Sequence, residues 1–221
     1  MIQDFRHDGE APRYFGVYPA IVTNIVDPDN LGRIELSFPW LGNDGDSVRA
    51  WATLITPYAD DGQGFEMLPS VDTQVVVAFE AGDLRRPYIV GATWNGREQL
   101  PEPPAAPNYK RLIKTRSGSL LEFDDADGAT KVTLSMRNGH KLSMDDAASE
   151  IELTHANGCT ITFTAGGQIE ITANATVELT ASTVNVHAPV ANFDGIINCT
   201  TLIASSGVVS PSYTPGAGNI W

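Results

Sequence analysis

Paired acids, a lone histidine and a set of aromatic residues are the candidates for chemistry in this sequence. The adjacent carboxylates Asp124-Asp125 and Asp145-Asp146 suggest the two acids of a glycoside hydrolase, which must lie ~5 to 9 Å apart across a sugar. Both pairs directly precede a turn, where aspartate side chains commonly accept backbone hydrogen bonds. Turn formation is therefore the favoured interpretation, and no catalytic residue is assigned.

His187 is the one candidate metal ligand, because a threefold axis would turn a single histidine into three. The alternation of Val184 and Val186 directs His187 to the opposite, outward face, which favours a solvated histidine. The sequence also lacks the nucleophile-elbow, zincin and phosphate-loop motifs. We therefore expect no metal, no cofactor and no enzyme activity.

Four aromatic residues could stack single-stranded bases if they lay on a barrel beside a basic groove: Trp40, Trp51, Phe65 and Trp94. The chain has 27 acidic and 14 basic side chains, and its formal charge of -13 repels nucleic-acid phosphates and anionic lipids. Packing in a core or between subunits is the better account of these aromatics, and we predict no nucleic-acid partner.

The composition restricts where such a chain can be made and kept. Apolar residues make up 42% of it, yet the longest apolar run, residues 75–79, is far short of the ~20 residues that span a bilayer. Residues 1–5 carry neither the cationic nor the apolar region of a signal peptide, and two cysteines, Cys159 and Cys199, suit a reducing compartment. We expect synthesis in a cytosol.

The N-terminal half has the pattern of short β-strands. Strands are predicted at residues 18–26, 32–38, 48–55, 72–79 and 87–94. The first two flank a turn sequence that begins at Asp27 and form a predicted hairpin, and Arg85-Arg86 with Asp83 are predicted to form an ion-paired turn. Five strands in about 80 residues suit a small closed barrel of the OB type.

A proline-rich connector separates this half from the rest of the chain. Residues 100–108 contain four prolines, which remove backbone donors and favour extended geometry. The last basic residue is Lys141, and residues 142–221 hold seven acids and no Lys or Arg. The second half therefore has no cationic clamp for phosphate in that region.

The second half carries an internal repeat centred on Gly118, Gly139 and Gly158, which lie 21 and 19 residues apart. Apolar residues stand three and five places after each glycine: Leu121 and Phe123, Leu142 and Met144, Ile161 and Phe163. The spacing is too short for a crossover helix, so strand-turn-strand units are predicted. His155 is interpreted as a turn residue. The alternation continues over residues 169–181 and, after a phase slip, over 184–190.

A ladder of short strands with one apolar stripe leaves that stripe uncovered when the chain is alone. Wrapping with two further copies would bury the stripe on a shared axis, so we expect an intertwined β-helix of three chains, with a single-chain solenoid as the rival. The predicted axis residues are Ile169, Ile171, Val177, Leu179, Val184 and Val186.

An ordered series of motifs runs through the N-terminal half: Asp27-Pro28, Leu31-Gly32-Arg33-Ile34, Phe38-Pro39-Trp40, Gly64-Phe65, Leu68-Pro69, Glu80-Ala81-Gly82-Asp83, Arg86-Pro87 and Trp94-Asn95-Gly96. The series resembles the OB-fold domain of the central spike, or baseplate assembly protein V, family of contractile-tailed phages and related contractile injection systems. It is also similar to the matching part of the type VI secretion spike. The resemblance covers roughly residues 16–99, and the repeats agree in kind with the trimeric β-helix that follows the OB domain in this family.

The fold that the resemblance implies is all-β, an OB-fold barrel followed by an intertwined trimeric β-helix needle. The expected divisions are an N-terminal arm (1–15), the barrel (16–99), the connector (100–108), a β-helix shaft (109–205) and a C-terminal tip segment (206–221). The sequence departs from the family pattern in two respects. It lacks the large N-terminal hub domain of the type VI spike, and it lacks the His-X-His by which some phage spikes bind iron at the tip.

The implied function is structural: a membrane-piercing spike at the centre of the baseplate, which caps the tube and punctures the target envelope when the sheath contracts. The implied partners are two further copies, the baseplate hub and tail tube proteins, and transiently the target outer membrane. Assembly would take place in the bacterial cytoplasm, and the product would be part of a virion or a secreted contractile particle. Four residues are predicted to form an apolar plug or a seat for a small conical tip protein: Tyr213, Pro215, Ile220 and Trp221.

Two functions of other classes stay open at this point. The first is a β-helical, tailspike-like glycan depolymerase, which predicts a groove lined by carboxylates. The second is an OB protein that binds single-stranded nucleic acid, which predicts binding that weakens with salt.

Overall fold

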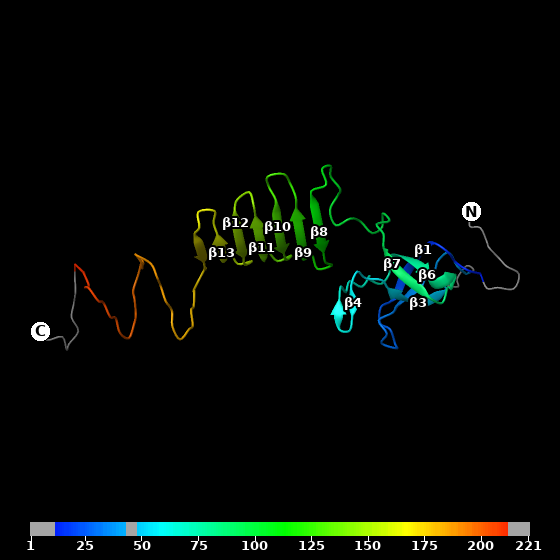
Figure 1. The fold of residues 1–221 in the computed structure, drawn as a ribbon, viewed down its shortest axis with the longest axis horizontal. Coiled ribbons are helices and arrows are strands. Elements are labelled where there is room, and N and C mark those ends of the chain that lie inside the picture. The colour runs from blue at the N-terminus through cyan, green and yellow to red at the C-terminus, as the bar shows by residue number, and fades with distance from the viewer. Residues whose placement is uncertain (1–11, 43–47, 212–221) are drawn as a thin grey trace. The chain divides into compact units, whose positions relative to one another are not determined.

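The computed structural model describes residues 12–42 and 48–211, and the ordered elements of this part of the chain are almost all β-strands (Figure 1). They form a closed five-stranded barrel, a two-stranded ribbon and a seven-stranded sheet. A single 3-10 turn, Glu80–Gly82, follows one barrel strand. Among the described residues, no helix is long and apolar enough to cross a membrane. The prediction of an all-β chain with an OB-type barrel is confirmed, whereas the intertwined β-helix stays a prediction.

The barrel strands, in the order in which they pair, are β1 (Val17–Asn24), β2 (Ile34–Ser37), β3 (Arg49–Leu54), β7 (Pro87–Ala92) and β6 (Gln74–Phe79). All five predicted strands are present, and β1 and β2 form the predicted antiparallel hairpin. The barrel closes through a short parallel contact between β3 and β7, in which Thr53 pairs with Tyr88. A small ribbon of β4 (Ala59–Asp60) and β5 (Gln63–Gly64) occupies part of the segment between β3 and β6.

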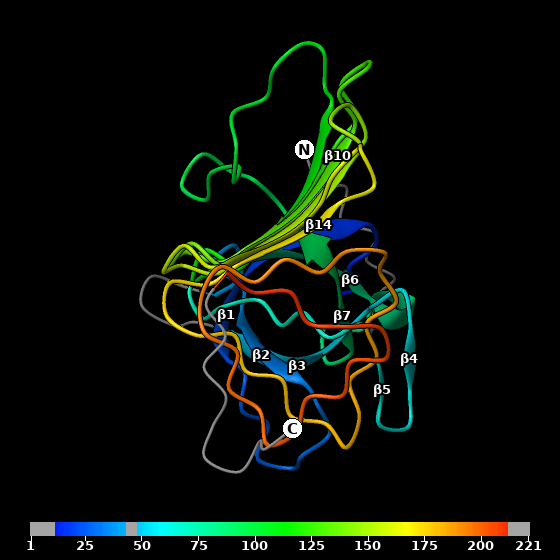
Figure 2. The ribbon, with the colours of Figure 1, turned by 90° about the vertical axis from the view of Figure 1, so that its left-hand side faces the viewer.

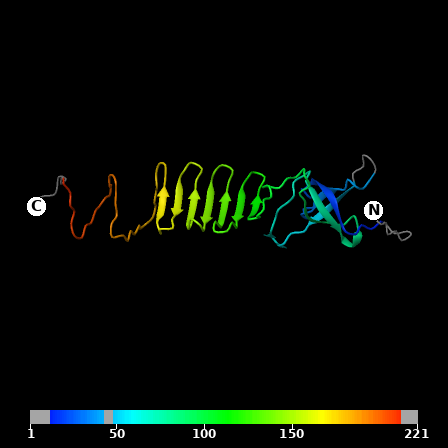
Figure 3. The same ribbon diagram turned by 90° about the horizontal axis from the view of Figure 1, so that it is seen from above.

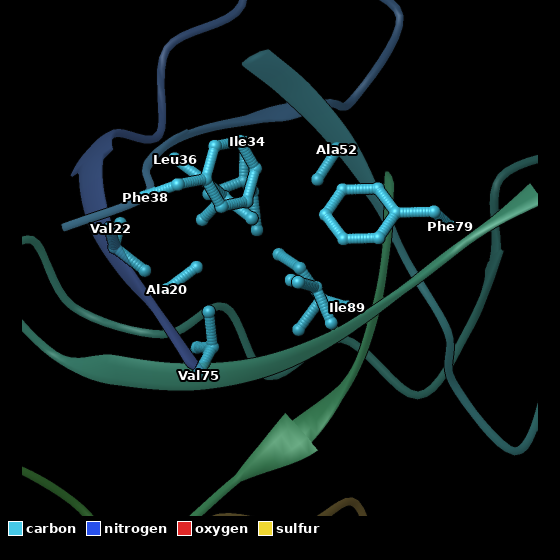
Figure 4. Packing of buried hydrophobic residues seen from close by; sticks show 10 residues of the cluster. Ala20, Val22, Ile34, Leu36, Phe38, Ala52, Val75, Phe79 and Ile89 are labelled. Carbon is cyan, nitrogen blue, oxygen red and sulfur yellow. The ribbon is translucent and has the colours of Figure 1, made fainter. Parts of the chain in front are cut away.

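Every second residue of the barrel strands points inward and builds the core (Figure 4). In β2 the buried side chains are Ile34 and Leu36, followed by Phe38 just beyond the strand. This alternation is the physical reason why the period-two pattern predicted these strands correctly. The buried apolar residues are Ala20, Val22, Ile34, Leu36, Phe38, Ala52, Val75, Val77, Phe79 and Ile89.

Two of the four candidate base-stacking aromatics make contacts within the barrel. The indole N–H of Trp40 donates to the carbonyl oxygen of Pro19 at 2.7 Å, and its ring stacks on Tyr18 with 4.6 Å between centroids. The guanidinium of Arg33 lies over Trp51, 5.7 Å from the ring centroid. Trp94, in contrast, is 62% exposed and lies outside the buried core. Packing within the chain therefore accounts for Trp40, as predicted, whereas packing of Trp94 between subunits stays a prediction.

Asp27 organises the turn that joins β1 to β2. Its buried carboxylate forms a two-pronged ion pair with the Arg33 guanidinium, at 2.8 and 2.9 Å, and accepts hydrogen bonds from the backbone amides of Asp29, Leu31 and Arg33. The hydrogen bonds from Arg33, together with those backbone donors, hold the pKa of Asp27 well below its ordinary value. The spacing of Asp27 and Arg33 in the sequence is thus explained by the turn.

The Asp27→Asn chain is expected to unfold at a lower temperature than the unaltered chain at neutral pH. Because the folded-state pKa of Asp27 is depressed, its stabilisation is fully present above the unfolded pKa of about 3.9 and is lost as the pH falls below that value. Thermal unfolding followed by circular dichroism from neutral pH to about pH 3 should show a steeper loss for the unaltered chain. Parallel pH profiles of the two chains would contradict this role.

The second half of the described chain is a meander of seven antiparallel strands: β8 (Lys110–Lys114), β9 (Leu120–Asp124), β10 (Lys131–Ser135), β11 (Lys141–Asp145), β12 (Glu150–Thr154), β13 (Thr160–Phe163) and β14 (Ile169–Thr172). Figure 3 shows these strands one after another, and Figure 2, in which they overlap, shows the turns gathered along two rims. Gly118, Gly139 and Gly158 have φ angles of 89°, 97° and 92° in their turns, a conformation that favours glycine. The predicted strand-turn-strand repeats are confirmed.

The alternating pattern over residues 169–181 and 184–190 forms a strand only over its first four residues. β14 ends at Thr172, and none of the residues from 173 to 211 is assigned to a strand. β14 is the last strand of its sheet, so the chain beyond it lacks a neighbouring strand of the same sheet to complete its backbone hydrogen bonds. The alternating pattern alone could not supply that partner.

Candidate assembly surface

One face of the seven-stranded sheet is made almost entirely of apolar side chains. The strand registers align two rows of residues across all seven strands. The first row is Ile113, Leu121, Leu134, Leu142, Leu153, Ile161 and Ile171. The second row is Arg111, Phe123, Val132, Met144, Ile151, Phe163 and Ile169. We call these two rows the apolar face, in which Arg111 is the one polar side chain.

The apolar face is largely exposed in the single chain. Leu134 and Leu153 are each 50% exposed, and the exposed fractions of Ile169 and Ile171 are 63% and 60%. On the opposite, polar face Ser143 is only 4% exposed. This is the reverse of a self-sufficient sheet, which buries its apolar side and exposes its polar side. The described residues leave the apolar face uncovered.

Cross-strand ion pairs line the polar face. Lys131 contacts Asp145 at 2.8 Å, and Lys141 contacts Glu152 at 3.0 Å. The hydrogen bond from Lys131 lowers the pKa of Asp145, and the hydrogen bond from Lys141 lowers the pKa of Glu152. Partly exposed pairs of this kind add little stability each, but they disfavour slippage of the register and keep this face hydrated.

The predicted turn role of the paired acids is confirmed. The Asp124 carboxylate accepts a hydrogen bond from the backbone amide of Ala126 at 3.0 Å, and the Asp145 carboxylate accepts one from Ala148 at 2.9 Å. Asp145 is also occupied by its ion pair with Lys131. These contacts account for the carboxylates by turn and sheet structure, and they lend no support to the depolymerase alternative.

The predicted ion-paired turn between β6 and β7 is confirmed in part. Arg85 pairs with Asp83 at 2.9 Å, and its hydrogen bonds lower the pKa of Asp83 to about 2. Arg86, which was assigned to the same carboxylate, pairs instead with Glu80 at 3.3 Å. The Asp83 carboxylate already accepts two side-chain hydrogen bonds from Arg85.

The predicted tip residues and the candidate metal ligand His187 are not part of the apolar face. The four candidate tip residues, Tyr213, Pro215, Ile220 and Trp221, lie outside the described residues, so a tip contact stays a prediction. His187 is exposed and belongs to the segment after β14. In the described ranges, no three His, Cys, Asp or Glu side chains are grouped so that they could hold a metal ion.

Sequence reasoning missed part of the apolar face. It counted the apolar residues after each repeat glycine but not those on the strands before them, such as Leu134, Ile151 and Leu153. The signal was available, because residues 131–135 and 150–154 alternate between apolar and polar side chains. Only the register, however, shows that both sets of residues form continuous rows.

Comparison with known proteins finds a family match in the region of the barrel. Residues 18–94 match the family described as the type VI secretion system/phage-baseplate injector OB domain. The chain is 27% identical over 115 residues to the type VI secretion system spike protein VgrG3 of Vibrio cholerae, a match that covers 48% of this chain and 11% of that protein. It is 25% identical over 136 residues to the spike protein VgrG4b of Pseudomonas aeruginosa, covering 59% of this chain and 16% of that protein.

A third relative is named as a toxin rather than as a spike protein. The chain is 26% identical over 113 residues to the actin cross-linking toxin VgrG1 of Vibrio cholerae, covering 48% of this chain and 10% of that protein. The matches thus span between a tenth and a sixth of the length of these three relatives.

Proposed function

We propose that this chain, whose residues 18–94 belong to the injector OB-domain family of type VI secretion systems and phage baseplates, is the structural spike of a contractile tail or injection machine. The observation that carries the proposal is the exposed apolar face of the sheet that follows the barrel. In this role three copies wrap around a common axis and bury their apolar faces against one another. The spike caps the tube and pierces the target envelope when the sheath contracts.

The width of the strands supports three copies. The strands have four or five residues, so each sheet is ~17 Å wide at most. Three sheets of that width around an axis place each sheet ~5 Å from the centre, roughly half of the usual ~10 Å separation of packed sheets. Side chains such as Leu142 and Leu153 are long enough to fill that space. Two copies packed as a sandwich are the simplest competing arrangement.

The segment after β14 fits the same arrangement. Val177 is 55% exposed and Leu179 is 75% exposed, and the alternating pattern around them finds no strand partner in the described part of the chain. Neighbouring copies would supply both the backbone partners and the cover that one chain lacks. We therefore retain the predicted shaft over residues 109–205.

The spike role calls for stiffness rather than catalysis. With the apolar faces inside, the polar faces and the net charge of -13 lie outside and oppose aggregation and adhesion to anionic lipid. We propose that the barrel contacts the baseplate hub and the tail tube, and that residues 206–221 form the tip or the seat of a tip protein. Assembly in the bacterial cytoplasm precedes incorporation into a virion or a secreted particle.

The function can be tested in a bacterium that produces the particle. Particles purified from cells that carry the chain should contain it together with sheath and tube proteins, detected by mass spectrometry. Particles from cells that lack the gene should fail to puncture target cells, measured as leakage of a cytoplasmic dye. Complete, puncturing particles without this chain would contradict the proposal.

A further inference from the structure

The turns along one rim of the sheet place sulfur and imidazole side chains side by side. Two pairs close successive turns on that rim: the backbone amide of Met136 donates to the carbonyl of His140 at 2.9 Å, and that of His155 donates to the carbonyl of Cys159 at 2.8 Å. These turns join β10 to β11 and β12 to β13, and β11 pairs with β12 between them. The resulting row across the sheet is Met136, His140, His155 and Cys159.

The two histidines of this row are in contact. Lys141 pairs with Thr154, so His140 and His155 occupy the next cross-strand position, and their ring centroids are 4.4 Å apart with an angle of 65° between the planes. His140 is partly exposed and His155 is exposed. Two imidazoles from adjacent strands are thus in edge-to-face contact at the rim.

In both histidines the hydrogen bonds are made at Nδ1, so Nε2 is the ring nitrogen considered as the ligand. Nδ1 of His155 lies 2.6 Å from the side-chain oxygen of Asn157 and 3.2 Å from the backbone amide nitrogen of the same residue. The first contact is a hydrogen bond when Nδ1 carries the proton and the second when Nδ1 is the acceptor, and the shorter contact favours the proton on Nδ1. The Nε2 lone pair of His155 is then available to a metal ion. Nδ1 of His140 accepts a long hydrogen bond of 3.4 Å from the amide of Ala156, and a proton shift to this nitrogen would free Nε2 at the cost of that weak contact.

The turn itself does not require histidine at these positions. In the first repeat the corresponding residues are Thr115 and Ser119, and the Thr115 hydroxyl accepts a hydrogen bond from the amide of Ser119 at 3.1 Å. The same closing backbone contact, from Thr115 to the Ser119 carbonyl, is made there at 2.9 Å. The structure of the turn therefore does not explain why two successive repeats carry imidazoles in contact.

We propose that His140 and His155 together bind a divalent late first-row transition-metal ion, each through Nε2, with Asn157 positioning the His155 ring. Imidazole is a preferred ligand of Ni²⁺, Cu²⁺ and Zn²⁺, and a hydrogen bond from the other ring nitrogen to a carbonyl oxygen is the usual support for a histidine ligand. No group of three such ligands is formed in the described residues, so water completes the coordination and the ion exchanges readily. Both ligands belong to one chain, so no second copy has to supply a ligand.

Titration of the untagged full chain with NiCl₂ in a calorimeter tests this site, because Ni²⁺ does not oxidise the nearby Cys159 thiol. We expect one Ni²⁺ per chain. The His140→Gln and His155→Gln variants should each bind more than about tenfold more weakly, and Asn157→Ala should weaken binding by roughly tenfold. His187→Gln is the matched control, since it removes an exposed histidine from the segment after β14 and should leave the affinity unchanged.

The circular dichroism spectrum of each variant is compared with that of the unaltered chain. A matching spectrum shows that weaker Ni²⁺ binding does not result from unfolding. Unchanged affinity in both His140→Gln and His155→Gln would overturn the proposal, as would the absence of binding heat with the unaltered chain. One ion per three chains, or equal loss of affinity in His187→Gln, would place the ion elsewhere and would also overturn it. Loss of Ni²⁺ binding in Cys159→Ser, without loss in either histidine variant, would also overturn the proposal.

Discussion

The Leu153→Lys chain is expected to remain a monomer under conditions in which the unaltered chain assembles. Leu153 lies in the first row of the apolar face, between Leu142 and Ile161 on the neighbouring strands. In the proposed assembly this position is enclosed by other copies, and a lysine ammonium there would be buried without a partner. The penalty is incurred once per chain, so the whole assembly should be lost rather than weakened. Size-exclusion chromatography with light scattering measures the outcome.

Thr162→Lys is the matched control for this prediction. Thr162 lies on the polar face of the same sheet, where the register places it between Glu152 and Glu170. A lysine at this position gains acidic neighbours and is expected to leave the assembly intact. If light scattering gives Leu153→Lys and Thr162→Lys the same assembled mass, the apolar face does not drive association.

The Phe38→Ala chain is expected to lose about 3–5 kcal/mol of barrel stability, the usual range for a buried phenylalanine. Phe38 is fully buried, and its ring lies 6.0 Å from that of Trp40 and 5.6 Å from that of Phe79, measured between centroids. Truncation removes the contacts on which this aromatic cluster rests and leaves a cavity that the closed barrel cannot readily fill. Urea unfolding followed by tryptophan fluorescence measures the loss.

Val90→Ala provides the comparison, because Val90 lies on β7 of the same barrel but is 50% exposed. A substitution at such a surface position is expected to change the stability of the barrel by less than about 1 kcal/mol. Equal losses for Phe38→Ala and Val90→Ala would mean that the cluster around Phe38 is not the core of the barrel.

The sequence predicted the elements whose cause is local. Alternation placed Ile34, Leu36 and Phe38 on one face, and the repeat glycines marked turns that need a positive φ. The acids at Asp124 and Asp145 were assigned to turns for the same reason, since their hydrogen bonds reach only two or three residues along the chain.

Features that depend on distant partners could not be predicted in this way. The parallel contact between β3 and β7 that closes the barrel joins segments more than thirty residues apart, and no local pattern encodes it. The β4–β5 ribbon lies between the strands predicted at residues 48–55 and 72–79, where no strand was predicted. The His140–His155 contact follows from the register of β11 and β12, and the strand expected beyond Thr172 needs a neighbour that one chain does not provide.

The central claim is that three copies of this chain cover one another's apolar faces, and the mass of the unaltered protein in solution tests it most directly. Light scattering should give about three times the chain mass of 23.7 kDa, and the same species should persist on an SDS gel when the sample is not heated. A mass equal to one chain would contradict the assembly, and a mass of two chains would replace the three-copy arrangement with a sandwich of paired sheets.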